Sequence, residues 1–336
     1  MDYFAYSVIF ATLSLLACLA CVPPLLIHIK ARNVAAIVLT LGIAILCFLN
    51  SLNALIWRSE DQDTWWDGKI LCDIEVKLYI GQGVSVDGVL LCLFRQIATI
   101  LDTEHMSVAP SRRQRNITLV IEICLCIVLP SLVMTAHYVV QRPRYWIRRI
   151  AGCTPSFDNS WPSFVLIYIW PMALCLAACV YCAVAMVRLW RHRRELSAVL
   201  SDTPGATRSQ NYRLISFAVI LLLIYLPLNT VAFVGNMSTP RHIYSWSYIH
   251  PPNWADVTTF YPVATPSFDR WAQTVTAYVL FGVFGLGRDT KQMYRSWFQW
   301  LKKCFGQAAQ RRNQVSTTAA PTSFQMSSHH HGVDHL

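Results

Sequence analysis

The sequence predicts an all-α membrane protein: a seven-transmembrane helix bundle followed by a short amphipathic helix. Hydrophobic residues make up 54% of the 336 residues and charged residues only 14%, which excludes a soluble multidomain protein. Lys and Arg gather on alternate connections between seven apolar runs, each about as long as the roughly 20 residues that cross a hydrocarbon core. These runs cover about 6–28, 34–57, 72–100, 117–139, 161–187, 213–236 and 268–286.

The first run lacks the basic flank of a cleavable signal peptide, so we expect it to remain in the protein as the first span. The fifth carries no charge between Trp161 and Val187, which is unusual for a soluble helix. Prolines interrupt the first, fourth, fifth and sixth runs and predict kinks there. They are Pro24, Pro130, Pro171 and Pro227.

After the seventh run, residues 289–304 place Met293, Trp297, Trp300 and Leu301 on one side of a predicted helix that lies in the membrane plane. We take 1–305 as one seven-span domain. The Gln-, Ser-, Thr- and His-rich segment 306–336 has no core-forming pattern, and we expect a disordered cytoplasmic tail.

The charge distribution predicts the orientation. With the amino terminus outside, 18 of the 28 Lys and Arg residues fall on inner segments and eight on outer connections. This bias favours an outside amino terminus and a cytoplasmic carboxyl terminus. The net charge of +10 then reflects an inner surface facing anionic lipid, and it does not imply nucleic acid.

Most of the twelve cysteines lie in apolar runs, where small hydrophobic packing is their usual role. Cys72 and Cys153 instead fall in the expected outer layer. An oxidising exterior would join them in a disulfide that ties the second outer loop over the mouth of the bundle; the alternative is two unpaired thiols.

Ionisable residues inside the third run suggest function, because charges are expensive in a bilayer. Asp73 and Lys77 share a helical face and are expected to pair. Arg95 is expected either to form an ion pair with Glu122 of the fourth run or to reach the inner headgroups. Asp87 is expected to anchor to Asn50 or Asn53 of the second run, or to contact a ligand or ion.

Two outer loops and one proline allow two interpretations each. The basic loop 142–149 is either a solvated connection or part of a ligand entrance, and the aromatic loop 237–267 is either an interfacial belt or a lid. Pro227 either fills space as a static kink or lets the inner half of the sixth span swing between two states.

Enzymatic interpretations are weak, since only His137 lies well inside a span, so no zinc cluster of catalytic or structural type can be assembled there. We expect no catalytic residues, no metal and no cofactor. A seven-span transporter or channel with Asp87 and Glu122 on an ion path is the alternative.

Several segments resemble the fungal mating-pheromone receptors for lipidated, a-factor-type peptides, which are class D G-protein-coupled receptors. The resemblance covers about 5–305, and its most distinctive parts are the second-loop Q-R-x-RY…GC and the sixth-span LPLN. The segments are HIKARN (28–33), LCDIEVKL (71–78), LCLFRQIATI (91–100), HYVVQRPRYWIRRIAGC (137–153), LPLNTVAFVG (226–235) and FGVFGLGRDTKQMYRSW (281–297).

The resemblance implies a plasma-membrane receptor for a farnesylated peptide pheromone that activates a heterotrimeric G protein through its α subunit. Membrane lipid is a further expected partner, and a homodimer is left open. On this basis Pro227 and Asn229 are the expected switch. The expected ligand contacts are Lys77, Tyr138, Arg144, Tyr145, Trp146, Tyr244, Trp246 and Trp254. The expected G-protein contacts are Arg95, Arg188, Arg191, Arg193 and Arg194.

Overall fold

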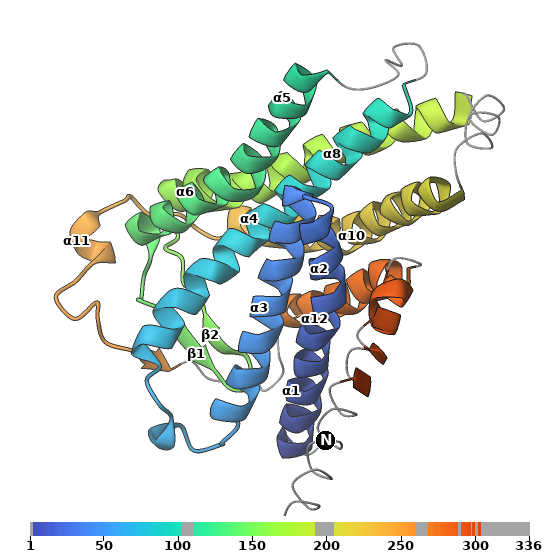
Figure 1. The fold of residues 1–336 in the computed structure, drawn as a ribbon. Coiled ribbons are helices and arrows are strands. Elements are labelled where there is room, and N and C mark those ends of the chain that lie inside the picture. The colour runs from blue at the N-terminus through green and yellow to red at the C-terminus, as the bar shows by residue number, and fades with distance from the viewer. Residues whose placement is uncertain are drawn as a thin grey trace, which may run out of the picture. The chain divides into compact units, whose positions relative to one another are not determined.

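A computed structural model describes residues 3–102, 111–191, 205–259, 268–287, 290–296, 298–299 and 302–303. The chain divides into two compact units, residues 1–290 and 291–336. The first unit is a helical bundle (Figure 1), and in the second the described residues are helical. The amphipathic helix expected over 289–304 is helical at 290–296 and stays a prediction as a whole. The expected disordered tail, 306–336, lies outside the described residues.

Six helical stretches are long and apolar enough to cross a membrane, which confirms the membrane assignment. They are Tyr3–Lys30, Val34–Ile56, Lys69–Ile100, Arg112–Val140, Trp161–Arg191 and Ile215–Ser238. In the seventh predicted run, α12 (Phe268–Leu280) is followed by a π-helical turn, Phe281–Gly285. Its buried face is polar, with Arg270, Gln273 and Thr276 turned inward. A membrane crossing by α12 therefore stays a prediction.

The first two spans pack as a pair. The first consists of α1 (Tyr3–Ala20) and α2 (Val22–Lys30), and the break at Cys21 precedes the Pro23-Pro24 pair, which cannot donate backbone hydrogen bonds. The second span is α3 (Val34–Ile56), capped by Asn33, whose side chain accepts from the Ala36 amide. A short 3₁₀ turn, Gln62–Thr64, leads to the third span.

The third span, α4 (Lys69–Ile100), is the central helix, and its neighbours include α3, α6, α8 and α10 (Figure 1). The fourth span runs through α5 (Arg112–Ile123), a π turn at Cys124–Val128, α6 (Leu129–Ala136) and a 3₁₀ turn at His137–Val140. Where α4 meets the π turn, a Cβ on Gly88 would lie 2.5 Å from the Leu125 carbonyl oxygen, and Ser85 donates to the Cys126 carbonyl at 3.0 Å.

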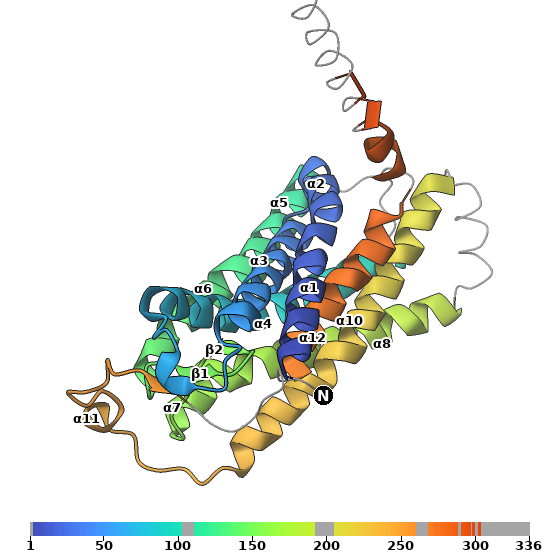
Figure 2. The same cartoon turned by 90° about the horizontal axis from the view of Figure 1, so that it is seen from below.

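The fifth span begins with α7 (Trp161–Ser163) and a π turn at Phe164–Tyr168, and continues as α8 (Ile169–Arg191). The expected kinks at Pro130 and Pro171 thus coincide with π turns just before each proline, which absorb the lost hydrogen bond. The sixth span is α10 (Gly205–Ser238), which continues through Pro227 and lies beside α12 (Figure 2).

The outer-loop segments form a small sheet that the all-α expectation did not include. β1 (Trp146–Arg148) pairs antiparallel with β2 (Gly152–Thr154) and parallel with β3 (Thr258–Thr259). A short helix, α11 (Trp246–Ile249), lies at the edge of the bundle (Figures 1 and 2). The sheet packs against the ends of α3 and α4. We call this end of the bundle the disulfide end, and the end that carries Asp102 and Arg188 the opposite end.

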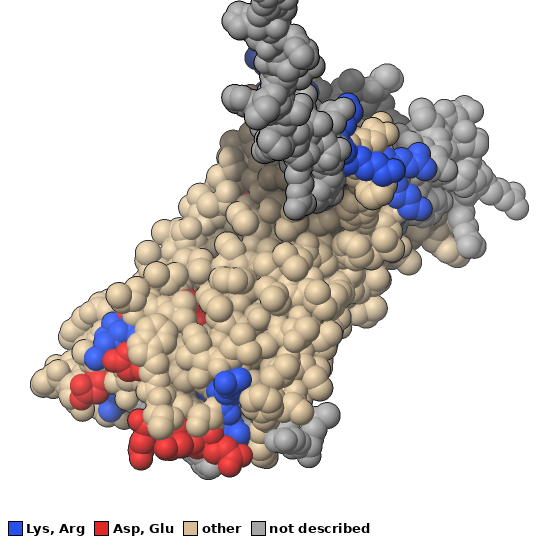
Figure 3. Space-filling view, turned by 60° about the horizontal axis from the view of Figure 1, so that its bottom comes forward, with Lys and Arg blue, Asp and Glu red and all other residues tan. Residues whose placement is uncertain are grey.

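The surface of the bundle matches a membrane setting. A broad belt of uncharged residues covers the face shown in Figure 3, and acidic and basic residues gather together at one end of it. Many large apolar side chains on this bundle are exposed, such as Leu223 at 70%, Val231 at 72% and Val180 at 62%. Exposure on that scale is expected of helices that face lipid.

Candidate functional site: a lidded cavity and its polar ties

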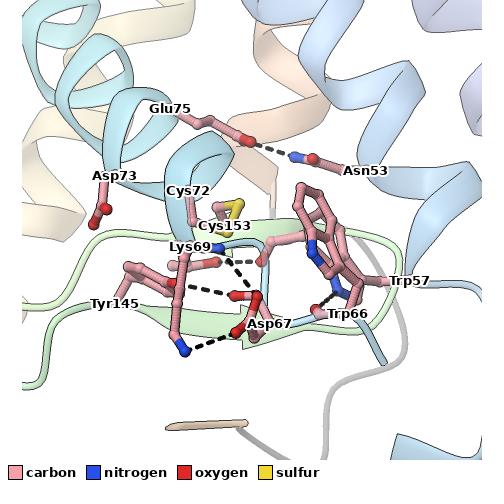
Figure 4. The surroundings of a disulfide bond; sticks show 12 residues. Asn53, Trp57, Trp66, Asp67, Lys69, Cys72, Asp73, Glu75, Tyr145 and Cys153 are labelled. Atoms are coloured by element: carbon pink, nitrogen blue, oxygen red, sulfur yellow. Dashed lines mark hydrogen bonds and ion pairs between the residues drawn. A yellow bond between two sulfur atoms is a disulfide. The ribbon is translucent and has the colours of Figure 1, made fainter. Parts of the chain in front are cut away.

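The loop between the fourth and fifth spans, called the second loop below, is fastened to the bundle by the Cys72–Cys153 disulfide (Figure 4). Trp57, Tyr145 and Ile147 pack around it and are fully buried. The Tyr145 hydroxyl donates to the Asp67 carbonyl at 2.9 Å, and burial raises the pKa of Tyr145 to about 12. Tyr145, an expected ligand contact, supports the loop in the structure, and its contact with a ligand stays a prediction.

The turn of this loop is held by backbone geometry. Gly152 has a φ of +66°, and a Cβ there would lie 2.3 Å from the Asn53 side chain. Ile150 also has a positive φ, 65°, which is unfavourable for a β-branched residue. Its amide donates to the Trp57 carbonyl at 2.8 Å and its side chain is buried, so packing compensates for the strain.

The expected Asp73–Lys77 pair does not form. Arg144 from the second loop binds Asp73 through both guanidinium Nε and Nη2, with Nε 2.8 Å from Oδ1. Lys77 lies one turn further on and contacts His137 Nδ1 at 2.8 Å and Gln141 Oε1 at 2.9 Å. Arg144 of the second loop therefore pairs with Asp73 in place of Lys77, which lies on the same helix as Asp73. The Asp73 hydrogen bond and charge raise the pKa of Arg144.

An aromatic cluster sits where the two outer loops meet. Tyr138 packs edge-on against Trp246 and Trp254, and His250 stacks on Trp246 with ring centroids 4.0 Å apart. Trp254 donates to the Gln141 carbonyl at 2.8 Å. Tyr138 and Trp246 remain 47% and 49% exposed, so the cluster keeps ring surface available.

The other two expected ligand contacts are Tyr244 and Trp146. The Tyr244 hydroxyl donates to the Val139 carbonyl at 3.3 Å. Trp146 forms the first pair of the small sheet with Thr154 and is half-buried. The structure thus gathers Tyr138, Trp246 and Trp254, while Lys77, Arg144 and Tyr145 have structural partners.

A buried ion pair joins the loop to α4 and α12, and sequence reasoning missed it. Arg270 Nη1 lies 3.1 Å from Glu75 Oε1, and the two side chains are 1% and 0% exposed. Arg270 also donates to Asn50 Oδ1 at 3.0 Å and to the Cys153 carbonyl. The signal in the sequence was an arginine inside an apolar run, which we had assigned to an outer connection.

The two asparagines of α3 form hydrogen bonds within the network around Arg270 and Glu75, and Asp87 has a different partner. Asn50 donates to Gln273 Oε1 at 2.9 Å, and Asn53 donates to Glu75 Oε1 at 2.6 Å (Figure 4). The expected Asp87–Asn50 or Asp87–Asn53 anchor is therefore wrong. Asp87 is fully buried and accepts from the Asn229 amide nitrogen at 2.9 Å with both carboxylate oxygens. Its partner lies two residues after Pro227 on α10.

A cavity of about 490 Å³ lies next to this contact, in the disulfide-end half of the bundle. It is bounded by α3, α4, the segment after β2, the fifth span, α10 and α12. Aliphatic and aromatic side chains dominate its walls, and the lining residues that the structure describes include no Lys, Arg or His. The residues that line the cavity include Tyr79, Val86, Leu228, Asn229, Asp269 and Gln273.

At the opposite end, the expected Arg95–Glu122 ion pair is absent: Glu122 accepts from Gln96 Nε2 at 2.6 Å. One residue along α4 turns a side chain by about 100°, so Gln96 and not Arg95 faces α5. Arg188 binds Asp102 at 2.9 Å and donates to the Ala98 carbonyl at 2.5 Å, which ties α8 to α4. Arg191 is exposed, and Arg193 and Arg194 lie outside the described residues.

These features define a polytopic helical membrane protein whose bundle holds an apolar cavity beneath a disulfide-fastened loop. Comparison with known families then places it: the profile of the STE3 family, pheromone A receptor, matches residues 9–306, so the chain belongs to that family of fungal pheromone receptors.

Individual relatives agree with this placement. The chain is 28% identical over 295 residues to the pheromone a factor receptor of Saccharomyces cerevisiae, covering 87% of this chain and 62% of that protein. It is 24% identical to the pheromone B alpha 3 receptor of Schizophyllum commune, covering 89% of this chain and 48% of the relative. It is 27% identical to pheromone receptor 1 of Ustilago hordei, covering 84% and 80%. The chain thus spans about half to three fifths of the first two relatives.

Proposed function

We propose that this chain is a plasma-membrane G-protein-coupled receptor for a farnesylated peptide pheromone, with the disulfide end and amino terminus outside and the opposite end in the cytoplasm. Binding of the pheromone promotes nucleotide exchange on the α subunit of a heterotrimeric G protein. The chain performs no covalent chemistry in this role. Membership of the pheromone receptor family supports the receptor part of the proposal.

The observation that carries the proposal is the cavity together with its position. Its volume of about 490 Å³ falls within the roughly 300–1,000 Å³ of small-ligand sites. Apolar walls suit a prenyl chain, which gains about 0.8 kcal/mol for each CH₂ group that leaves water. The partly exposed aromatic cluster of Tyr138, Trp246 and Trp254 offers ring surface to the peptide part of the ligand.

Asn229 supplies the connection between ligand and signal. Its side chain lines the cavity and also holds both oxygens of Asp87. A ligand beside Asn229 would therefore disturb the two hydrogen bonds through which Asn229 of α10 holds Asp87 of α4. Pro227, one half-turn away, removes a backbone hydrogen bond and makes α10 easier to bend there. In this proposal α10 bends at Pro227 between two arrangements, and this bend couples ligand binding to the G protein.

The opposite end carries the groups that would meet the G protein. Arg188 and the exposed Arg191 end α8, and Arg95 lies near the end of α4. Arg193 and Arg194 extend this basic segment in the sequence. In this proposal, movement of α10 releases the Arg188–Asp102 contact and opens a basic surface for the carboxyl-terminal helix of the α subunit.

Nucleotide exchange on a co-expressed fungal α subunit tests the proposal directly. The receptor in membranes is given a farnesylated pheromone or the same peptide without the prenyl group. We expect acceleration by the lipidated peptide alone. Equal responses to both peptides would contradict the prenyl assignment. Ion or solute flux without any exchange would support a transporter.

A further inference from the structure

The cavity has one acidic group in its wall and no basic side chain among its described lining residues. Asp269, in the first turn of α12, lines the cavity and accepts a hydrogen bond from the Tyr79 hydroxyl. The neighbouring cation, Arg270, binds Glu75 and Asn50, and its guanidinium lies over the Tyr79 ring, 4.4 Å from the ring centroid. No described Lys, Arg or His forms an ion pair with Asp269.

Asp269 therefore shares the charge of its neighbouring cation with a second carboxylate. Glu75 and Asp269 both lie beside the single guanidinium of Arg270, which forms an ion pair only with Glu75. Two further cations of α4 and the second loop contact other groups: Arg144 binds Asp73, and Lys77 contacts His137 and Gln141. A carboxylate among apolar side chains is costly without a counter-charge, so the cavity favours a ligand that brings one.

The cavity is also graded along its length. Tyr79 and Asp269 lie near the disulfide end of their helices, whereas Val86 lies seven residues, or about 10 Å, deeper along α4. Leu228 and the aromatic ring of Tyr225 line the wall on the α10 side. The carboxylate thus lies nearer the disulfide end than Val86, and apolar walls continue on the deeper side of it.

We propose that Asp269 is a specificity-determining residue that binds a cationic side chain of the pheromone, close in sequence to its lipidated cysteine, while the prenyl chain occupies the deeper apolar part. This inference rests on the proposed function and adds the charge and the direction of the ligand. The cation must lie within a few residues of the cysteine, because only about 10 Å separates the carboxylate from the deep wall. Tyr79 holds the carboxylate in place through its hydroxyl.

The experiment compares farnesylated peptides that differ at one position near the cysteine, with Lys, Gln or Glu there. Nucleotide exchange gives the half-maximal concentration of each peptide on the intact receptor, on Asp269→Asn and on Asp269→Lys. Glu60→Gln is the matched control, since Glu60 is a carboxylate at the same end that is exposed and paired with Arg149. The amount of each variant at the cell surface is measured in parallel.

We expect the intact receptor and Glu60→Gln to prefer the Lys peptide over the Gln peptide by roughly tenfold, the effect of one charge-assisted contact. Asp269→Asn should lose that preference while still responding to prenylated peptides, and Asp269→Lys should prefer the Glu peptide. If Asp269→Asn reaches the surface poorly, the preference of Asp269→Lys between the Lys and Glu peptides still tests the inference.

Two results would overturn the inference. An unchanged Lys-to-Gln ratio in Asp269→Asn would show that this carboxylate does not bind the cation. Equal responses of the intact receptor to all three prenylated peptides would remove the charge requirement and leave the proposed function standing. If prenylated and unprenylated peptides act alike on the intact receptor, the proposed function fails instead, and this inference fails with it.

Discussion

The two ends of the bundle are held together in different ways. At the disulfide end, a covalent bond, a fully buried ion pair and a three-stranded sheet bind the second loop to α3, α4 and α12. At the opposite end, α8 is tied to α4 by the Arg188–Asp102 contact, whose side chains are 33% and 24% exposed. The difference indicates that the disulfide end is a rigid frame for the ligand and that the opposite end is where helices separate at low cost.

The largest effect is expected at the buried ion pair. Arg270→Ala leaves Glu75 buried without its counter-charge, which costs roughly 3–5 kcal/mol. We expect the receptor to be almost absent from the cell surface, as measured by labelling of intact cells. The double variant Arg270→Met/Glu75→Leu removes both charges and should recover part of the surface signal. A double variant no better than the single one would show that the pair matters for more than its charge.

A second, slightly smaller effect is expected at the loop that covers the bundle. Cys153→Ser removes a disulfide that spans 81 residues and should cost roughly 2–5 kcal/mol. The midpoint temperature of unfolding in detergent should fall, and surface delivery should drop with it. Cys124→Ser, at an exposed free cysteine, is the control and should leave both values unchanged. Normal thermal stability in Cys153→Ser would mean that the frame does not depend on this bond.

At the opposite end the expected change is in signalling and not in folding. Asp102→Asn removes a partly exposed ion pair worth about 1 kcal/mol or less and leaves Arg188 available to the G protein, so surface amounts should be near normal. Nucleotide exchange without pheromone should rise severalfold, because the closed arrangement loses one of its contacts. A fall in surface delivery as large as that of Arg270→Ala would erase the distinction between the two ends.

The smallest effect concerns pH. His242 lies just beyond α10 and contacts Asp158 at 2.9 Å; a hydrogen bond to the Ile243 carbonyl and the Asp158 charge raise its pKa, against a weaker opposing effect of Arg142. A raised pKa in the folded state means that this contact contributes fully below pH about 6.5 and is lost as the pH rises through the folded value. Pheromone affinity should therefore weaken slightly from pH 6 to pH 8, and His242→Gln should abolish that slope. An identical slope in both proteins would exclude His242 as its source.

The sequence predicted the spans well, since the length of an apolar run is a local property. The six confirmed spans begin or end within a few residues of the expected bounds, and basic ends such as Arg188–Arg191 extend the fifth helix past its apolar run. Pairings between helices were predicted poorly. Glu122 binds Gln96 and not Arg95, and Asp87 binds Asn229 and not an asparagine of α3.

These pairings depend on the rotation and depth of each helix, which the apolar pattern leaves undetermined. The Arg270–Glu75 pair joins residues 195 apart in sequence, and the Arg144–Asp73 pair competes with a local partner one turn away. Neither the sequence separation of two residues nor the helical face they share shows which ion pair forms in the folded protein. The same holds for the sheet, whose third strand comes from a loop more than a hundred residues beyond the first.

The central claim is that the Asp87–Asn229 contact couples the cavity to α10, and basal nucleotide exchange by Asn229→Ala tests it most directly. The variant shortens one side chain that lines the cavity and removes both hydrogen bonds to Asp87. Our account predicts, for each receptor at the cell surface, raised exchange without pheromone and a smaller further increase on adding it. Unchanged basal exchange together with an unchanged pheromone response would contradict the account.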